Sequence, residues 1–308
     1  MGRARNQGTG VGVASRSIAG LDHPRGVPGS AGTLAPFSLA PDTRWLQFQE
    51  RPSYVRGRSG VDLGSLLHAY GLFSRSGRDM DMPGQTWETL LAEVTGGTQL
   101  CGDGGKLAHD VVATSERAGW QTKTVEWSGA RRGRLVLGLV APREIPDHAE
   151  LPAPELAKRV LENFAVRFED SCDRLGIEDS RLAVLARLPK DGVVHYFEEP
   201  FYPSEVDPCD LEWSKREGSL AGHRDGRLVL EWYFGRGQLR YHLRVPPHAV
   251  AIDIPAPLPT DAYVAAGSLG EALQAGRESD GKLDSTAIRV LARRLRAGDL
   301  RVPTASGR

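Results

Sequence analysis

Three polar side chains in the middle of the chain have types and a spacing that suit phosphate chemistry. Asp110 opens one β-prone run, and Gln121 and Lys123 lie in the next one, residues 119–125. Side chains two residues apart in a strand point to the same side, so Gln121 and Lys123 share a face. If the two runs pair as a hairpin, the three groups meet at one point. A carboxylate, an amide oxygen and an ammonium together suit a hard divalent cation beside a phosphate.

The chemistry that these groups could support is hydrolysis of a phosphodiester. That reaction needs a water activated near neutral pH and compensation for the charge that develops on the phosphate. Mg²⁺ takes only one or two protein carboxylates and keeps several waters. The predicted Mg²⁺ ligands are Asp110, the side-chain oxygen of Gln121 and the main-chain carbonyl of Thr122. Lys123 is predicted to position the attacking water, with Glu88 supporting the site from an upstream helix.

Helices of clear periodicity are predicted on both sides of these strands. Upstream, residues 63–73 form a short apolar helix, and a second helix begins at Thr86 as N-cap and ends at Gly96-Gly97. Downstream, the helix from Pro154 to about Gly176 has the clearest apolar stripe in the chain. The residues of that stripe are Leu156, Val160, Leu161, Phe164 and Phe168.

The remaining β-prone runs are short and are separated by turn residues. A third strand is predicted over 134–140, and strands 182–188 and 193–197 flank the hairpin signal Lys190-Asp191-Gly192. Further strands are predicted over 227–234, 238–245 and 249–254, followed by a basic helix over 288–296. This order predicts an α/β (α+β) core in which a mixed β-sheet is flanked by helices.

The order of these residues resembles the PD-(D/E)XK nuclease superfamily, which includes many type II restriction endonucleases. In that superfamily a helix often carries a glutamate, the next strand an aspartate and the following strand an acidic-x-Lys signature, here Glu88, Asp110 and Gln121-Thr122-Lys123. The resemblance covers residues 85–190 as topology. It implies a restriction-endonuclease-like core, Mg²⁺, double-stranded DNA as substrate and a homodimer that cuts both strands of a palindrome. His109 replaces the pattern's proline, and Gln121 replaces its Glu or Asp.

A DNA-recognition part is predicted over about 205–254, because aromatic and basic residues alternate there in loop-like sequence. Arg, Lys and Gln in loops and turns can read guanine and adenine edges in the major groove. An ordinary hairpin with solvated charges is the alternative, and the basic helix 289–296 is a second candidate for phosphate contact. The predicted DNA-binding residues are Lys215, Arg216, Arg224, Arg236, Gln238 and Arg240.

Composition limits the class of protein. Lys+Arg and Asp+Glu both number 39, whereas a protein that coats nucleic acid without sequence preference would be basic overall. The three cysteines lie far apart without CxxC spacing, which argues against a zinc site or a disulfide framework. No apolar run approaches the roughly 20 residues of a membrane span, so a cytoplasmic protein is predicted.

Three regions are predicted along the chain. Residues 1–42 are rich in Gly, Ser, Arg and Ala, which predicts a disordered arm or translation from a start codon upstream of the natural one. Ordered structure is expected from about residues 45–54. Residues 43–260 form the nuclease-like domain, and residues 261–308 a C-terminal helical tail.

Two other classes of function stay open at this stage. One is a non-catalytic DNA-binding or regulatory relative in which Gln121 marks a degenerate site. The other is a small-molecule enzyme or protein-interaction module, because an Asp followed by Gln-x-Lys arises easily by chance. The carboxylate pair Glu198-Glu199 is predicted to be solvated, and the glycine-rich loop 101–105 lacks the Gly-Lys-Ser/Thr of a phosphate loop.

Overall fold

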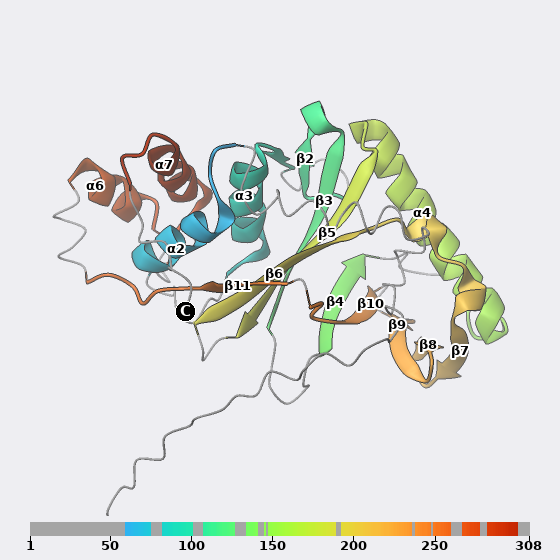
Figure 1. The fold of residues 1–308 in the computed structure, drawn as a ribbon. Helices are drawn as coiled ribbons and strands as arrows, with labels where there is room; N and C mark the ends of the chain where they lie inside the picture. Colours follow the sequence, from blue (N-terminus) through green and yellow to red (C-terminus); the bar gives the residue numbers. More distant parts are fainter. Residues whose placement is uncertain are drawn as a thin grey trace, which may run out of the picture. The chain divides into compact units, whose positions relative to one another are not determined.

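Two β-sheets and five helices make up the described part of the computed structural model (Figure 1). All of it belongs to one of the two units into which the chain divides, Leu34–Arg308. The residues described are 59–74, 82–100, 107–126, 134–140, 145, 147–188, 192–235, 238–247, 249–259, 267–277 and 282–300. The predicted arm 1–42, the ordered start at 45–54, the loop 101–105 and Arg236 lie outside them.

The larger sheet has six strands in the order β1-β2-β3-β5-β6-β11. β3 and β5 are parallel, and every other neighbouring pair is antiparallel, so the sheet is mixed as predicted. β5 carries the continuous apolar run Leu182–Ala186, which is typical of a strand buried on both faces. The strand bounds are β1 Thr98–Gln99, β2 Val111–Ala113, β3 Ala118–Glu126, β5 Asp179–Leu188, β6 Val193–Pro200 and β11 Val250–Asp253.

Helices cover both faces of this sheet. On one face, α2 and α3 pack over alternate strand residues such as Trp120, Ala183 and Tyr196, while α7 packs against α2 and α3, and α6 against α7. On the other face, α4 packs over Leu182 and Val184, which point the opposite way from Ala183. The helix bounds are α2 Leu63–Phe73, α3 Gly84–Thr95, α4 Ala153–Leu175, α6 Ser268–Ala275 and α7 Ser285–Arg296.

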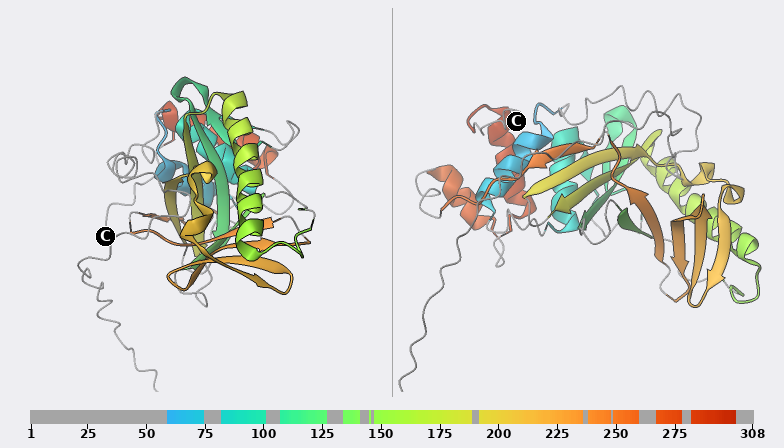
Figure 2. Two further views of the ribbon diagram at one scale, coloured as in Figure 1. Left: turned by 90° about the vertical axis from the view of Figure 1, so that its right-hand side faces the viewer. Right: turned by 60° about the horizontal axis from the view of Figure 1, so that its bottom comes forward.

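The smaller sheet is antiparallel, with five strands in the order β4-β10-β9-β8-β7. Its inner face sends Leu137, Leu230 and Tyr241 into the same core as α4, which leaves the alternate residues on its outer face. Figure 2 shows these strands side by side next to α4. The strand bounds are β4 Arg134–Val140, β7 Glu212–Arg216, β8 Ser219–Arg224, β9 Arg227–Tyr233 and β10 Gln238–Arg244, and short 3₁₀ turns lie at Thr114–Glu116, Pro203–Glu205 and Pro208–Asp210.

Most predicted elements are confirmed, with two differences. Thr86 is not the N-cap of its helix: α3 begins at Gly84, where the Trp87 N–H bonds the Pro83 carbonyl and closes an earlier first turn. The stretches 213–217 and 223–227, predicted as loops, lie largely in β7, β8 and the start of β9. Their sequences are weakly apolar, and pairing with neighbouring strands overrides that local preference.

The C-terminal residues contribute to the core. α7 buries Ala287, Ile288 and Leu291 against α2 and α3. On its polar side, Arg296 pairs with Glu93 at 2.6 Å. Within the described ranges, no helix combines the length and apolar character that a membrane crossing requires.

Candidate functional site

Asp110 lies at the strand fork, the place where β2 and β3 stop pairing and β3 continues without β2 beside it. The last bond between the two strands runs from the Asp110 N–H to the Trp120 carbonyl, at 2.8 Å. β3 then continues to Glu126, paired with β5 on one side and with no described strand on the other. The predicted hairpin is therefore confirmed. Gln121, Thr122 and Lys123 are the first residues of β3 that are paired with β5 but not with β2.

The Asp110 carboxylate is held by Thr122. Its Oδ2 accepts a hydrogen bond from the Thr122 N–H at 2.7 Å and one from Thr122 Oγ1 at 3.2 Å. No described residue donates to Oδ1, which leaves that oxygen able to bind a cation. The two bonds to Oδ2 fix the orientation of the carboxylate at the strand fork.

Glu88 and Lys123 lie close enough to Asp110 for the three charges to affect one another. Partial burial raises the pKa of Glu88; a hydrogen bond from Gln99 Nε2 at 3.0 Å opposes the shift, Asp110 adds to it and Lys123 opposes it. Burial lowers the pKa of Lys123, against the opposing attraction of Asp110 and Glu88. The charges of Glu88, Asp110 and Lys123 thus act on one another at the strand fork, with Lys123 on the Val184 face of β3 and α3 over the opposite face.

Gln121 is held differently from the other predicted site residues. Its Nε2 donates to the Ala108 carbonyl at 3.2 Å, and the side chain is only 5% exposed. Its Oε1 is buried and has no hydrogen-bond partner in the described part of the chain. The structure therefore ties Gln121 to the segment that leads into Asp110 and leaves one amide oxygen unsatisfied.

His109, noted from the sequence only as the residue in place of the pattern's proline, anchors the residues before Asp110. Its ring nitrogens lie 3.1 Å from Ser171 Oγ of α4 and 2.8 Å from Ser180 Oγ of β5. Burial lowers the pKa of His109 to about 4, so the imidazole is neutral near neutral pH. Gly119 faces the ring, and a Cβ there would come within 2.8 Å of it. The two hydrogen-bonding contacts of His109 and its packing on Gly119 become visible only in the folded structure.

The carboxylate pair Glu198-Glu199 is not solvated, contrary to the prediction. Both residues lie in β6, an inner strand, and are 4% and 6% exposed. Glu198 Oε2 accepts from Trp120 Nε1 and pairs with Arg181 Nη1, both at 3.1 Å. Glu199 points the other way, where Tyr241 donates to its Oε2 at 3.3 Å.

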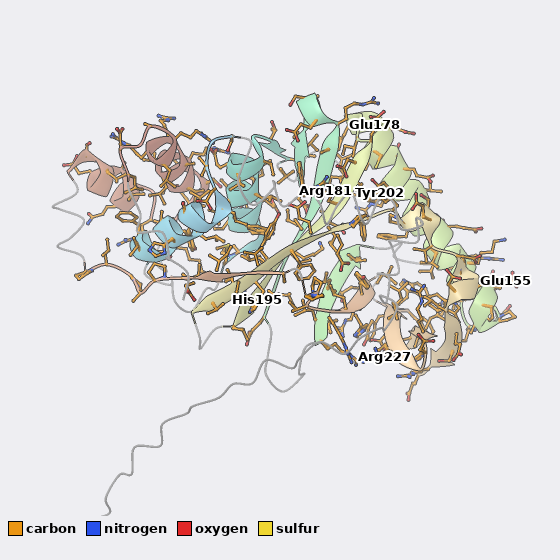
Figure 3. The ribbon with its side chains drawn as sticks, viewed as in Figure 1. Glu155, Glu178, Arg181, His195, Tyr202 and Arg227 are labelled. Carbon is orange, nitrogen blue, oxygen red and sulfur yellow. The ribbon has the colours of Figure 1, made fainter. Side chains whose placement is uncertain are left out.

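Arg181 is the centre of the ion-pair network on the Glu198 side. It also pairs with Asp179 at the start of β5. Figure 3 shows Arg181 beside Tyr202, whose hydroxyl accepts a hydrogen bond from the Ser180 N–H at 3.3 Å. The network joins β3 at Trp120, β5 at Asp179 and Arg181, and β6 at Glu198.

Three of the predicted DNA-binding residues share the outer face of the smaller sheet. The strand register aligns Arg216, Ser219, Tyr233 and Gln238 in one row from β7 to β10. Arg240 is on the same face as Gln238, and its guanidinium lies 4.4 Å from the centre of the Tyr233 ring. Arginine stacked on an aromatic ring within a row of polar side chains is suited to contact with nucleic acid.

The other three predicted DNA-binding residues do not join this row. Lys215 points to the opposite side of β7, where Nζ donates to the Ala149 carbonyl at 2.9 Å. The side chain of Arg224 is only 17% exposed and lies 3.9 Å from Asp210. Arg236 falls outside the described residues. Alternation within β7 and β8 separates these side chains, because neighbouring residues of a strand face opposite ways.

Two arginines that sequence reasoning missed extend the outer face. Arg134 of β4 is the register partner of Arg244 of β10, and both are exposed. Like charges at paired positions repel each other, so an anion between them is favoured. The alternation of Gln238, Arg240 and Arg244 along one strand was the signal that could have revealed the face.

The site offers few but suitable donors for a cation. Among the described residues, no group of three or more His, Cys, Asp or Glu side chains could hold a metal ion. Mg²⁺ needs only one or two carboxylates, and Asp110 and Glu88 supply hard oxygen donors at the fork. In comparisons with protein-family models, curated proteins and solved structures, the chain matched none.

Proposed function

We propose that this protein is a Mg²⁺-dependent endonuclease of the restriction type that hydrolyses double-stranded DNA. The observation that supports the proposal is the strand fork. There the Asp110 carboxylate is fixed by Thr122, and the charges of Glu88 and Lys123 act on it. An oriented carboxylate, a second carboxylate and an amine of lowered pKa are the groups that hydrolysis of a phosphodiester requires.

The residues at the fork fit a bound Mg²⁺. Asp110 Oδ1 accepts no hydrogen bond from the residues described, and the buried Oε1 of Gln121 is unsatisfied. Asp110, the Gln121 oxygen and the Thr122 carbonyl would hold the ion, with Glu88 adding negative charge. When bound, Mg²⁺ supplies a water of lowered pKa and neutralises charge on the phosphate.

The chain's own residues have distinct tasks in this proposal. Thr122 keeps the Asp110 carboxylate oriented through two hydrogen bonds. Burial lowers the pKa of Lys123, which raises the fraction of its amine that is neutral, and the neutral amine can orient the attacking water and accept its proton. Gln99 holds the carboxylate of Glu88 in place. His109 anchors the backbone that precedes Asp110.

The outer face of the smaller sheet is the proposed DNA-contacting surface. Arg134, Arg216, Arg240 and Arg244 present cationic groups there, while Gln238 can read a base edge. A homodimer would place two strand forks on the two strands of a palindromic site. Log K falls as log salt rises, with a slope set by the number of phosphate contacts. Removal of Arg134 and Arg244 should make this negative slope shallower by roughly 2.

A non-catalytic DNA-binding relative is the second candidate. The observation that favours it is Gln121, a neutral side chain whose amide is already engaged with the Ala108 carbonyl. Without a carboxylate at this position the site has one negative charge fewer, which weakens attraction for a divalent cation.

Digestion of supercoiled plasmid with and without Mg²⁺ tests both candidates. Asp110→Ala and Lys123→Ala should each abolish Mg²⁺-dependent cleavage while DNA binding in a gel-shift assay persists. The control is Asp170→Ala, which removes an exposed acid on α4. Cleavage by the two fork variants at the wild-type rate would overturn the nuclease. Binding without cleavage by the wild-type protein would establish the second candidate.

A further inference from the structure

An elongated groove lies along the outer side of α4, away from the residues used in the proposed function. One wall is α4 between Pro154 and Glu169, and the other is the segment Pro203–Trp213 that leads into β7. The groove has a volume of about 1070 Å³. Fifteen residues of helix separate the two ends of the α4 wall, a length of about 22 Å at 1.5 Å per residue. A trough of that length suits a peptide segment better than a compact small molecule.

The groove has an apolar interior that is open to solvent. Leu161, Val206 and Trp213 line it, together with Val166, which is 65% exposed. Among the described residues, Val166 and Val250 are the large hydrophobic side chains that are exposed. An exposed aliphatic side chain inside a groove marks apolar surface that a partner could bury.

The rim of the groove is acidic. Five of the lining residues are Asp or Glu, and one, Lys158, is basic. Lys158 is already paired with Glu162, whereas Glu169 and Glu212 have no ion-pair partner among the residues that the structure describes. Glu155 extends from α4 in Figure 3 at the same rim. This negative surface would repel DNA and attract a cationic partner.

We propose that this groove binds a basic amphipathic segment of a partner protein. Aliphatic side chains of the segment would cover Val166 and Trp213, and its Lys or Arg residues would pair with Glu169 and Glu212. The length of the groove matches about four helical turns. This inference does not depend on the nuclease, because the groove shares no residue with the strand fork.

The test uses fluorescence anisotropy with a labelled amphipathic helical peptide made of leucine and lysine. A peptide with glutamate in place of lysine is the ligand control. Glu169→Lys/Glu212→Lys and Val166→Lys should each weaken binding of the cationic peptide by at least about tenfold, since each removes close to 1.4 kcal/mol or more of binding free energy. Asp170→Lys/Glu217→Lys makes the same charge change at two exposed acids that do not line the groove and should leave binding unchanged.

Three outcomes would overturn the proposal. The first is an affinity that is equal in wild-type and groove variants, and the second is equal binding of the acidic peptide. The third is a wild-type dimer in light scattering that becomes monomeric in Val166→Lys, because the face would then join two copies of this chain. Circular dichroism of each variant checks that the fold is intact, and all the substituted positions are exposed.

Discussion

Asp110 Oδ2 accepts hydrogen bonds from both the main-chain N–H and the hydroxyl of Thr122, at 2.7 and 3.2 Å. Thr122 is adjacent to both Gln121 and Lys123, so the strand that carries the Gln-x-Lys pattern also orients the carboxylate of the other strand. The middle residue of the pattern therefore has a positioning role that the pattern itself does not express.

Replacement of Thr122 by valine tests this role. Thr122→Val keeps the N–H bond and the shape of the side chain but removes the hydroxyl bond, which should lower the free energy of unfolding by about 0.5–1.5 kcal/mol. DNA cleavage should fall while DNA affinity persists. Urea unfolding and plasmid digestion measure the two effects. The matched control is Thr114→Val at an exposed turn. If Thr122→Val cleaves DNA at the wild-type rate, the Thr122 hydroxyl does not position the Asp110 carboxylate for cleavage.

Replacement of Gln121 by glutamate tests whether this position decides metal binding. Gln121→Glu loses the Nε2 donor to the Ala108 carbonyl, so without Mg²⁺ the free energy of unfolding should fall by about 1–3 kcal/mol. The added carboxylate should make stabilisation by Mg²⁺ larger than in wild type. Thermal unfolding with and without Mg²⁺ measures both effects, with the exposed change Gln274→Glu as control. An identical Mg²⁺ response in wild type and Gln121→Glu contradicts the expectation.

The buried ion pair of Arg181 and Glu198 should be costly to break. Arg181→Met leaves Glu198 buried without its cation and should cost about 3–5 kcal/mol of unfolding free energy. Adding Glu198→Gln to that variant removes the uncompensated charge and should restore part of the loss. Arg174→Met breaks an exposed pair on α4 and should cost less than about 1 kcal/mol. If Arg181→Met and Arg174→Met lower the free energy of unfolding equally, burial does not determine the cost of breaking an ion pair.

Glu199 should make stability depend on pH. Burial raises its pKa to about 7 from the ordinary value of 4.5, although the hydrogen bond from Tyr241 opposes the shift. A raised native pKa favours folding at low pH, and this contribution is lost as the pH rises from 4.5 through 7.

Glu199→Gln should therefore gain stability relative to wild type by as much as about 3 kcal/mol between pH 4.5 and 8. Chemical denaturation across this range measures the difference, in which the contributions of other groups, such as His109, cancel. Glu150→Gln, at an exposed position before α4, is the control. If the difference in unfolding free energy between Glu199→Gln and wild type does not change with pH, Glu199 is not the group that titrates.

The helices and the strand hairpin around the site were readable from sequence because their signals are local. The stripe of α4 repeats at helical spacing and ends at Gly176, whose positive φ of 65° suits glycine. The predicted helix over residues 63–73 matches α2, where Asp62 caps the first turn. Periodicity and caps act within a few residues, so they are visible in the chain itself.

Contacts between distant segments were not readable. β4 follows β3 in sequence but pairs with β10 in the other sheet. The partners of His109 are 62 and 71 residues away, and Glu198 lies 78 residues from Trp120. A single sequence carries no direct signal for such pairings, since they depend on which surfaces become buried together.

The sequence by itself determined the long helices, most of the strands of the larger sheet, the mixed character of that sheet and the meeting of Asp110 with the strand of Gln121 and Lys123. Tertiary structure alone decided that Gln121 bonds Ala108, that Glu198 and Glu199 are buried and that the predicted DNA-contacting residues divide between two faces. The physical reason is range. Local conformational preference acts along the chain, whereas burial and hydrogen bonding of side chains depend on neighbours that only the packed fold supplies.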